Sequence, residues 1–312
     1  MGAVKRALAW VVPAAAAAAV APVARGDGGD AWMFVAAGRT MLSGDWSRTF
    51  ANPGIQVGPL QLLLYGTVGR VPVLTAVLLG VAAAVLVVAA ARAAGVTQPR
   101  LLAGVGLAAV ATGFTRAGWD AGHPADSWLP LLWILAAADA RRGRTVRAGL
   151  VVGLSAGLET WGVLGVAVLA LAPSVRGAAR GFVVAAVSAA ALFLPFVAGG
   201  HFGMDHYRWV VSSQSLVSWF VAPGTAVAWP LRLAQGALAV GAGVAVARAT
   251  RGSRHAVWLV PGVVVLVRLL LDPLDSGYYF VAIEGPALVG LALAAAVGLR
   301  LPGRRLAGEP LA

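Results

Sequence analysis

Long apolar runs alternate with short polar segments along most of the chain, and this pattern predicts a bundle of membrane-spanning helices. The runs are rich in Ala, Val and Leu, and a helix needs roughly 20 such residues to cross about 30 Å of hydrocarbon. The predicted spans are 7–24, 71–92, 100–117, 127–140, 147–158, 160–172, 180–198, 217–247, 255–271 and 279–299. The expected fold class is therefore an all-α, polytopic membrane protein with about ten transmembrane helices.

Two stretches depart from the regular spacing of the spans. Residues 147–172 are too few for two full crossings, so we expect two short helices that meet at the sequence GLETW. Residues 58–70 precede Pro72 and are predicted to form a helix in the outer membrane interface.

The organisation that follows is a single integral membrane domain over residues 1–312. Its parts are a first span at 1–24, an outer loop with interfacial helices at 25–70, the remaining spans at 71–299 and a cytoplasmic tail at 300–312. The basic start, apolar middle and small residues of the N-terminal segment would also suit a cleaved signal peptide. We favour a retained signal anchor, because many further spans follow and Lys5 and Arg6 would hold the N-terminus in the cytoplasm.

Composition supports the membrane assignment and excludes two other classes of protein. Hydrophobic residues make up 60% of the chain, charged residues 12%, and the mean hydropathy is +0.84, which no soluble domain of this size would show. The net charge of +12 comes from short basic clusters between apolar runs and not from one basic face, so no nucleic-acid partner is expected. The chain has no Cys, which excludes disulfides and thiolate metal sites.

The distribution of charge predicts the topology. With the N-terminus in the cytoplasm, 16 of the 24 basic residues fall in cytoplasmic segments, as the positive-inside rule requires. Nine of the 12 acids then fall outside, namely Asp27, Asp30, Asp45, Asp120, Asp126, Glu159, Asp205, Asp272 and Asp275. We therefore expect a multi-pass protein of the cell membrane with both termini in the cytoplasm.

The outer side also collects His123, His201, His206 and several Trp and Tyr residues. Polar residues at membrane depth usually face a cavity or a site, so an extracytoplasmic site is the resulting hypothesis. For the aromatic residues taken singly, we favour an interfacial belt as the explanation of their position.

Asp30 begins a predicted helix in the outer loop, because apolar positions recur after it at helical spacing and Gly44 can end the helix. Two roles are open for its carboxylate. It could cap the helix by accepting the first free amides, or it could act as a general base that takes a proton from an acceptor hydroxyl. Asp27 is the alternative candidate for the base.

Four segments carry a resemblance to a known family. They are GDGGDAWMFVAAGRTMLSGDW followed by QVGPLQLLLY, then AGHPAD, RAGLVVGLSAGLETW and RLLLDPLDSGYY. Together they resemble the glycosyltransferase C superfamily, in particular the actinobacterial polyprenyl-phosphate-mannose-dependent mannosyltransferase-like integral membrane proteins. The resemblance implies an extracytoplasmic active site, a polyprenyl-phosphate sugar donor, and a catalytic role for the Asp that follows the first span, which Asp30 matches.

The predicted substrate-binding residues lie in the later segments and are His123, Asp126, Glu159, Arg268, Asp272, Tyr278 and Tyr279. His123 and Asp126 flank Pro124, which is also good helix-start chemistry. Arg268 could pair with Asp272 four residues on, or its guanidinium could hold a lipid phosphate through bidentate bonds. The His and Asp spacings match no zinc motif, so the sequence predicts no metal and no cofactor, although it does not exclude a divalent ion.

The leading functional hypothesis is transfer of a sugar from a polyprenyl-phosphate donor to a lipid or glycan acceptor outside the cytoplasm. The alternatives are a transporter or flippase for a lipid-linked or small polar substrate, and a catalytically inactive membrane subunit. The sequence shows no internal repeat, which favours the one-sided site over an alternating-access pathway. The expected partners are the lipid bilayer, the donor and the acceptor.

Overall fold

The computed structural model describes residues 2–23, 29–274 and 277–298. Within them the twelve α-helices are α1 (Gly2–Val20), α2 (Ala31–Met41), α3 (Pro59–Val68), α4 (Pro72–Ala94), α5 (Pro99–Ala111), α6 (Phe114–Asp120), α7 (Pro124–Arg141), α8 (Thr145–Leu158), α9 (Val175–Ala198), α10 (Trp229–Ala249), α11 (Ala256–Leu270) and α12 (Val281–Gly298). The 3₁₀ helices are η1 (Ala21–Val23), η2 (Trp46–Arg48), η3 (Thr160–Leu171), η4 (Met204–His206), η5 (Leu216–Trp219) and η6 (Gly277–Phe280). Two short strands, β1 (Trp209–Val210) and β2 (Ala226–Val227), pair antiparallel. The all-α fold class is confirmed.

The helices fall where the apolar pattern predicts them. Each of the ten predicted spans contains a helix, and the two helices predicted in the outer loop, one beginning at Asp30 and one over 58–70, correspond to α2 and α3. The two short helices predicted in 147–172 are α8 and the 3₁₀ helix η3, which meet at Glu159.

One predicted span starts too early. The span predicted at 217–247 becomes helical only at Trp229, and the residues before it form η5, a turn and strand β2. Gly224 has a φ of +84° in this turn, and Pro223 precedes it. Such a pair suits a turn and not a helix interior.

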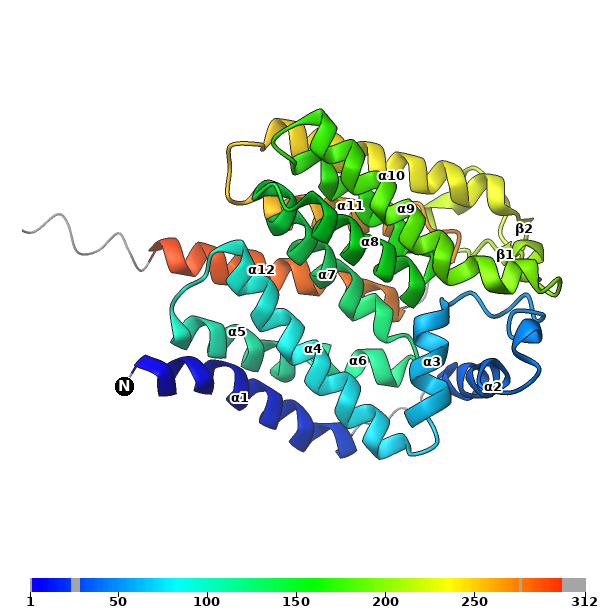
Figure 1. The fold of residues 1–312 in the computed structure, drawn as a ribbon, viewed down its shortest axis with the longest axis horizontal. Coiled ribbons are helices and arrows are strands. Elements are labelled where there is room, and N and C mark those ends of the chain that lie inside the picture. The colour runs from blue at the N-terminus through cyan, green and yellow to red at the C-terminus, as the bar shows by residue number, and fades with distance from the viewer. Residues whose placement is uncertain (1, 24–28, 275–276, 299–312) are drawn as a thin grey trace, which may run out of the picture.

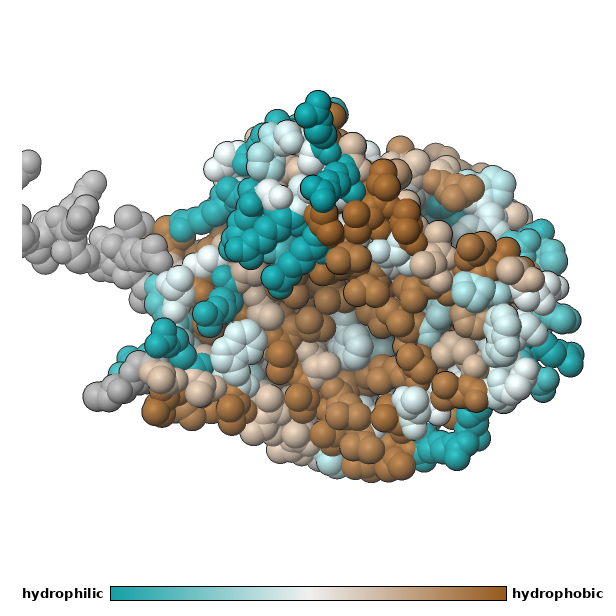
Figure 2. Space-filling model, in the orientation of Figure 1, coloured by the Kyte–Doolittle hydropathy of each residue, from teal (hydrophilic) through white to brown (hydrophobic). Residues whose placement is uncertain are grey.

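Six helices in the described part of the chain are long and apolar enough to cross a membrane: α1, α4, the α5–α6 pair, α9, α10 and α12. Many of their outward side chains are apolar, including Phe182 and Leu194 on α9 and Leu233 and Leu238 on α10. Figure 2 shows the result as a broad apolar surface between two more polar ends. A helix that is apolar on every side suits a lipid environment, so the structure is consistent with a multi-pass membrane protein.

The bundle has a larger and a smaller apolar core. The larger one lies among α4, α7, α11, α12 and their neighbours, with Trp133 fully buried. The smaller one joins α2 and α3 to the start of α4. Here α2 and α3 approach so closely that a Cβ on Gly38 would lie 2.2 Å from the Leu62 carbonyl oxygen, so only glycine fits.

The two ends of the bundle differ in character. Helices α2 and α3 and the two strands lie together at one end, opposite the N-terminus (Figure 1). The α7–α8 and α10–α11 turns at the other end carry Arg141, Arg142, Arg144, Arg251 and Arg254. Most of the predicted site residues that the structure describes, in contrast, lie at the end that holds α2 and α3, because they precede or begin α2, α7 and η3 or lie at the end of α11.

Candidate functional site

Asp30 occupies the N-cap position of α2, but its side chain does not cap the helix. The carboxylate Oδ2 instead lies 3.2 Å from His123 Nε2, ninety-three residues further along the chain. The side chain of Asp30 is 54% exposed, whereas that of His123 is 11% exposed. Asp30 is therefore an accessible carboxylate that is oriented by a buried imidazole, and the simple capping role is not observed.

The position of His123 is set by the turn between α6 and α7. Gly122 has a φ of +77°, which glycine adopts at no steric cost, and Tyr65 Oη donates a 2.9 Å hydrogen bond to the Gly122 carbonyl oxygen. The Phe34 ring contacts the His123 ring edge to face at 5.1 Å between centroids. Residues from α2 and α3 thus fix the imidazole beside Asp30.

The pKa values of Asp30 and His123 reflect their contact. The hydrogen bond from His123 and its charge hold the pKa of the Asp30 carboxyl below its usual range, although partial burial opposes this. Burial works against protonation of His123, but the hydrogen bond to Asp30 and the neighbouring carboxylates outweigh it and raise its pKa. Asp30 is therefore ionised at neutral pH.

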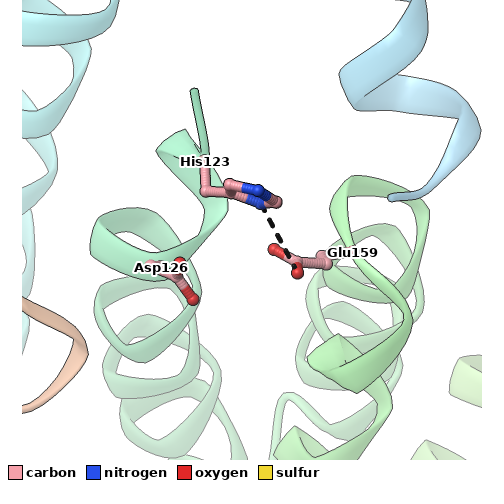
Figure 3. Close-up of side chains that lie close together, drawn as sticks. All are labelled: His123, Asp126 and Glu159. Atoms are coloured by element: carbon pink, nitrogen blue, oxygen red, sulfur yellow. Dashed lines mark ion pairs between the residues drawn. The ribbon is translucent and has the colours of Figure 1, made fainter. Parts of the chain in front are cut away.

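Two further carboxylates lie on the other side of the imidazole. Asp126 is one turn below His123 on α7, and Glu159 lies opposite at the junction of α8 and η3, where its extended backbone pairs with Val57. Figure 3 shows the three side chains pointing into the space between these elements. His123 Nδ1 is 3.8 Å from Glu159 Oε1, and one ligand-type atom from each of the three residues lies within 4.8 Å of the others.

The carboxylates of this cluster are buried without full hydrogen bonding. Asp126 is 1% exposed, and among the described residues neither of its oxygens has a hydrogen-bond partner; Glu159 Oε2 also has none there. Within the described residues, no arginine lies within 4.0 Å of either carboxylate as an ion-pair partner. Buried carboxylates are costly unless they are paired or hydrogen-bonded, so their arrangement favours a cationic or hydrogen-bonding ligand.

Arg268, near the end of α11, is a buried cation that interacts electrostatically with this cluster. It is 3% exposed, stacks over Trp161 at 4.2 Å and over Tyr279 at 5.1 Å, and interacts electrostatically with Asp126 and Glu159. Its Nη2 is 3.7 Å from Asp272 Oδ2, whereas Nε and Nη1 have no hydrogen-bond partner in the part of the chain that the structure describes. The predicted Arg268–Asp272 pair is present, but it leaves part of the guanidinium free to bind another group.

Asp272 has a closer partner in Arg232 of α10. Arg232 Nη1 lies 2.8 Å from Asp272 Oδ1, and its guanidinium lies over the Trp209 ring at 5.0 Å. The sequence analysis did not predict a role for Arg232. The available signal was its position inside the predicted span 217–247, since an arginine within a span usually faces a partner or a cavity.

An apolar groove of about 320 Å³ begins at these two arginines. It runs between η3 and α10, and its walls include Trp161, Leu164, Leu233 and Val240. Because Leu233 is largely exposed on the outer face of α10, the groove lies at the apolar surface of the bundle. One end of the groove is therefore cationic and the rest is apolar.

A second cavity, of about 510 Å³, lies between α2 and the start of α4. Its lining includes Ala31, the residue after Asp30, and Trp32, with Arg39 and Arg70 among the polar members. This second cavity is therefore lined by the residue next to Asp30 in the chain.

The other predicted residues are placed as follows. Asp27 lies outside the described residues, as does the side chain of Tyr278. His201 contacts the Gly199 carbonyl oxygen and His206 lies near Asp205, so neither joins His123. The structure therefore brings Asp30, His123, Asp126, Glu159, Arg268, Asp272 and Tyr279 to one end of the bundle.

Comparisons with protein-family models, with curated proteins and with solved structures find no match to this chain. The candidate site is therefore interpreted from its own geometry.

Proposed function

We propose that this chain is a membrane glycosyltransferase that moves a sugar from a polyprenyl-phosphate donor to a lipid or glycan acceptor. The observation that carries the proposal is the presence, at one end of the bundle, of an accessible oriented carboxylate and a buried arginine with unpaired nitrogens at the end of an apolar groove. A lipid-phosphate donor needs both an anion site and an apolar surface, and an acceptor hydroxyl needs a base.

Asp30 is the proposed general base. Its Oδ2 accepts the hydrogen bond from His123, which leaves Oδ1 for the acceptor hydroxyl. A hydroxyl is a weak nucleophile until its proton is removed, and an ionised carboxylate within hydrogen-bond reach can remove it. His123 then acts as a positioning residue that holds the carboxylate in place.

Arg268 is the proposed phosphate-binding residue. Its Nε and Nη1 have no hydrogen-bond partner among the described residues, so each could donate a charge-assisted hydrogen bond to a phosphate oxygen. The prenyl chain would lie in the groove along η3 and α10. The cavity beside Arg39 and Arg70 is the proposed entry for the acceptor.

We further propose that the chain crosses the membrane about ten times with both termini in the cytoplasm, so that the site faces outward. The basic turns at the opposite end of the bundle support this orientation through the positive-inside rule.

The deciding experiment measures transfer from a radiolabelled polyprenyl-phosphate sugar to native lipid acceptors, per folded molecule. Asp30→Asn keeps the shape and removes the base, so transfer should fall about 100-fold to 10,000-fold. Asp45→Asn is the matched control, since Asp45 is also an exposed N-cap residue of the same loop whose side chain does not cap its helix. Asp27→Asn tests the alternative base.

Unchanged transfer in Asp30→Asn would remove the base role. If the wild-type protein transfers no sugar but moves a lipid-linked sugar across vesicle membranes, the transporter alternative replaces the proposal. If it does neither, the chain is an inactive subunit.

A further inference from the structure

We propose that His123, Asp126 and Glu159 form a binding site for a divalent transition-metal cation such as Mn²⁺ or Zn²⁺. The ligands would be His123 Nδ1 and one oxygen from each carboxylate. The inference does not rest on sugar transfer, because cation binding is measured without a substrate.

The first argument is charge. Asp126 and Glu159 are both buried, and no arginine forms an ion pair with either of them in the described part of the chain. Arg268 is directed to Asp272 and to the rings of Trp161 and Tyr279. Two buried carboxylates without an ion-paired arginine can together balance the charge of one divalent cation.

The second argument is the free bonding capacity of the carboxylates. Among the described residues, neither the two oxygens of Asp126 nor Oε2 of Glu159 have a hydrogen-bond partner, although Asp126 is almost completely buried. A folded protein rarely leaves such groups unsatisfied, and a bound cation would provide a partner for one oxygen of each carboxylate. Figure 3 shows that the two carboxylates approach from opposite elements, as ligands around a central ion would.

The third argument is the orientation of the imidazole. His123 Nε2 faces Asp30 at 3.2 Å, and Nδ1 faces Glu159 at 3.8 Å. Metal-binding histidines commonly donate their second N–H to a carboxylate, which fixes the tautomer and makes the other nitrogen a better ligand. Asp30 occupies that supporting position.

The distances allow an ion after small movements. The three ligand atoms lie within 4.8 Å of one another, whereas ligands about 2.0–2.2 Å from one ion are roughly 3–3.5 Å apart. A bound ion would close this difference through rotation of the three side chains. One imidazole with two carboxylates suits Zn²⁺ or Mn²⁺ better than Ca²⁺, and three protein ligands leave a coordination position open, as in catalytic sites.

The test uses full-length protein in detergent, stripped with a chelator and dialysed against Mn²⁺. We expect one bound Mn²⁺ per chain by elemental analysis, and a nitrogen coupling from one imidazole in its pulsed electron paramagnetic resonance spectrum. Asp126→Asn and Glu159→Gln should each weaken binding more than about 100-fold, and Asp30→Asn about 10-fold to 100-fold. The imidazole coupling should disappear in His123→Gln.

Asp139→Asn is the matched control, because Asp139 is a buried carboxylate of the same helix that is already paired with arginines. Its Mn²⁺ affinity should equal that of the wild type. Absence of stoichiometric binding in the folded wild-type protein would overturn the proposal, as would binding that persists in both Asp126→Asn and Glu159→Gln. If Mn²⁺ binds but no sugar is transferred, the cation site stands and only the proposed function fails.

Discussion

The two ends of α7 each bury a carboxylate, and the two carboxylates differ in their partners. Asp139 lies 2.9 Å from Arg147 Nε and 3.7 Å from Arg144 Nη1. Asp126, thirteen residues earlier on the same helix, has no hydrogen-bond partner on either oxygen. Burial of a carboxylate therefore does not distinguish a ligand-binding site from a structural ion pair. Carboxylate oxygens that lack hydrogen-bond partners do distinguish the two.

The arginines near the two ends of α7 differ in the same way: those at the Asp139 end have hydrogen-bond partners, and the one at the Asp126 end has nitrogens without them among the described residues. At the Asp139 end, Arg141 donates to the Ser253 carbonyl oxygen and Arg142 to that of Ala93. At the Asp126 end, the buried Arg268 keeps two nitrogens free. We expect substitutions at the first end to change stability and substitutions at the second end to change ligand binding.

The largest expected effect concerns the side of the membrane that each end faces. The chain has no Cys, so single cysteines can be introduced at Ser213, near the site end, and at Gly252, in the α10–α11 turn. Both positions are exposed. An impermeant maleimide should label Ser213→Cys on intact cells and Gly252→Cys only after lysis. Labelling of Gly252→Cys on intact cells would invert the proposed orientation.

The second effect concerns the arginines of the two ends. Arg268→Ala should weaken binding of a polyprenyl phosphate about 10-fold to 100-fold, because each charge-assisted hydrogen bond contributes roughly 1.5–3 kcal/mol. Arg268→Lys keeps the charge but loses the fork, so its affinity should be intermediate. Arg144→Ala at the opposite end is the control and should bind as the wild type does. Equal affinities in all four proteins, measured by titration calorimetry, would leave Arg268 as a structural partner of Asp272.

The third effect compares the two carboxylates directly. Asp139→Asn should lower the free energy of unfolding by about 1–3 kcal/mol, since Asp139 is buried but its arginine partners are exposed. Asp126→Asn, measured without metal, should leave stability unchanged or raise it, because neither oxygen of this buried carboxyl has a hydrogen-bond partner among the described residues. Unfolding in increasing concentrations of dodecyl sulfate gives both values. A larger loss in Asp126→Asn than in Asp139→Asn would contradict the comparison.

The smallest effect concerns the support of His123. Tyr65→Phe removes the hydrogen bond to the Gly122 carbonyl oxygen and should cost about 0.5–1.5 kcal/mol of stability. Tyr207→Phe serves as the control, because the Tyr207 hydroxyl donates no hydrogen bond to any of the described residues. A Tyr65→Phe protein as stable as this control would show that the packing of Phe34 alone holds the turn.

Much of the fold could be predicted from the sequence because the apolar runs record directly which segments are helical. The breaks at Pro72 and at GLETW were equally visible, and both coincide with helix ends. The start of α10 was missed because residues 217–228 are apolar enough to extend the run, and hydropathy does not report a turn inside it. Pro223 and Gly224 were the signals that should have ended that prediction.

The residues of the candidate site could be predicted from the sequence, but the contacts between them could not. Asp30, His123 and Asp126 stood out as polar residues at helix starts, and spacing alone relates only the last two. Their approach to Glu159 depends on how α7 packs against α8 and η3, which no local pattern encodes. The three-residue cluster was therefore not predicted, and neither was the pairing of Asp30 with His123.

The 3₁₀ winding of η3 has a consequence for the depth of the site. Twelve residues at about 2.0 Å each extend roughly 24 Å, and the fourteen residues of α8 at about 1.5 Å extend roughly 21 Å. Both are shorter than the approximately 30 Å of a hydrocarbon layer. If α8 begins and η3 ends at the basic membrane face, their junction at Glu159 lies several ångströms beneath the opposite face. The bilayer would then thin around a small depression above the site, while a prenyl chain stays in the lipid beside it.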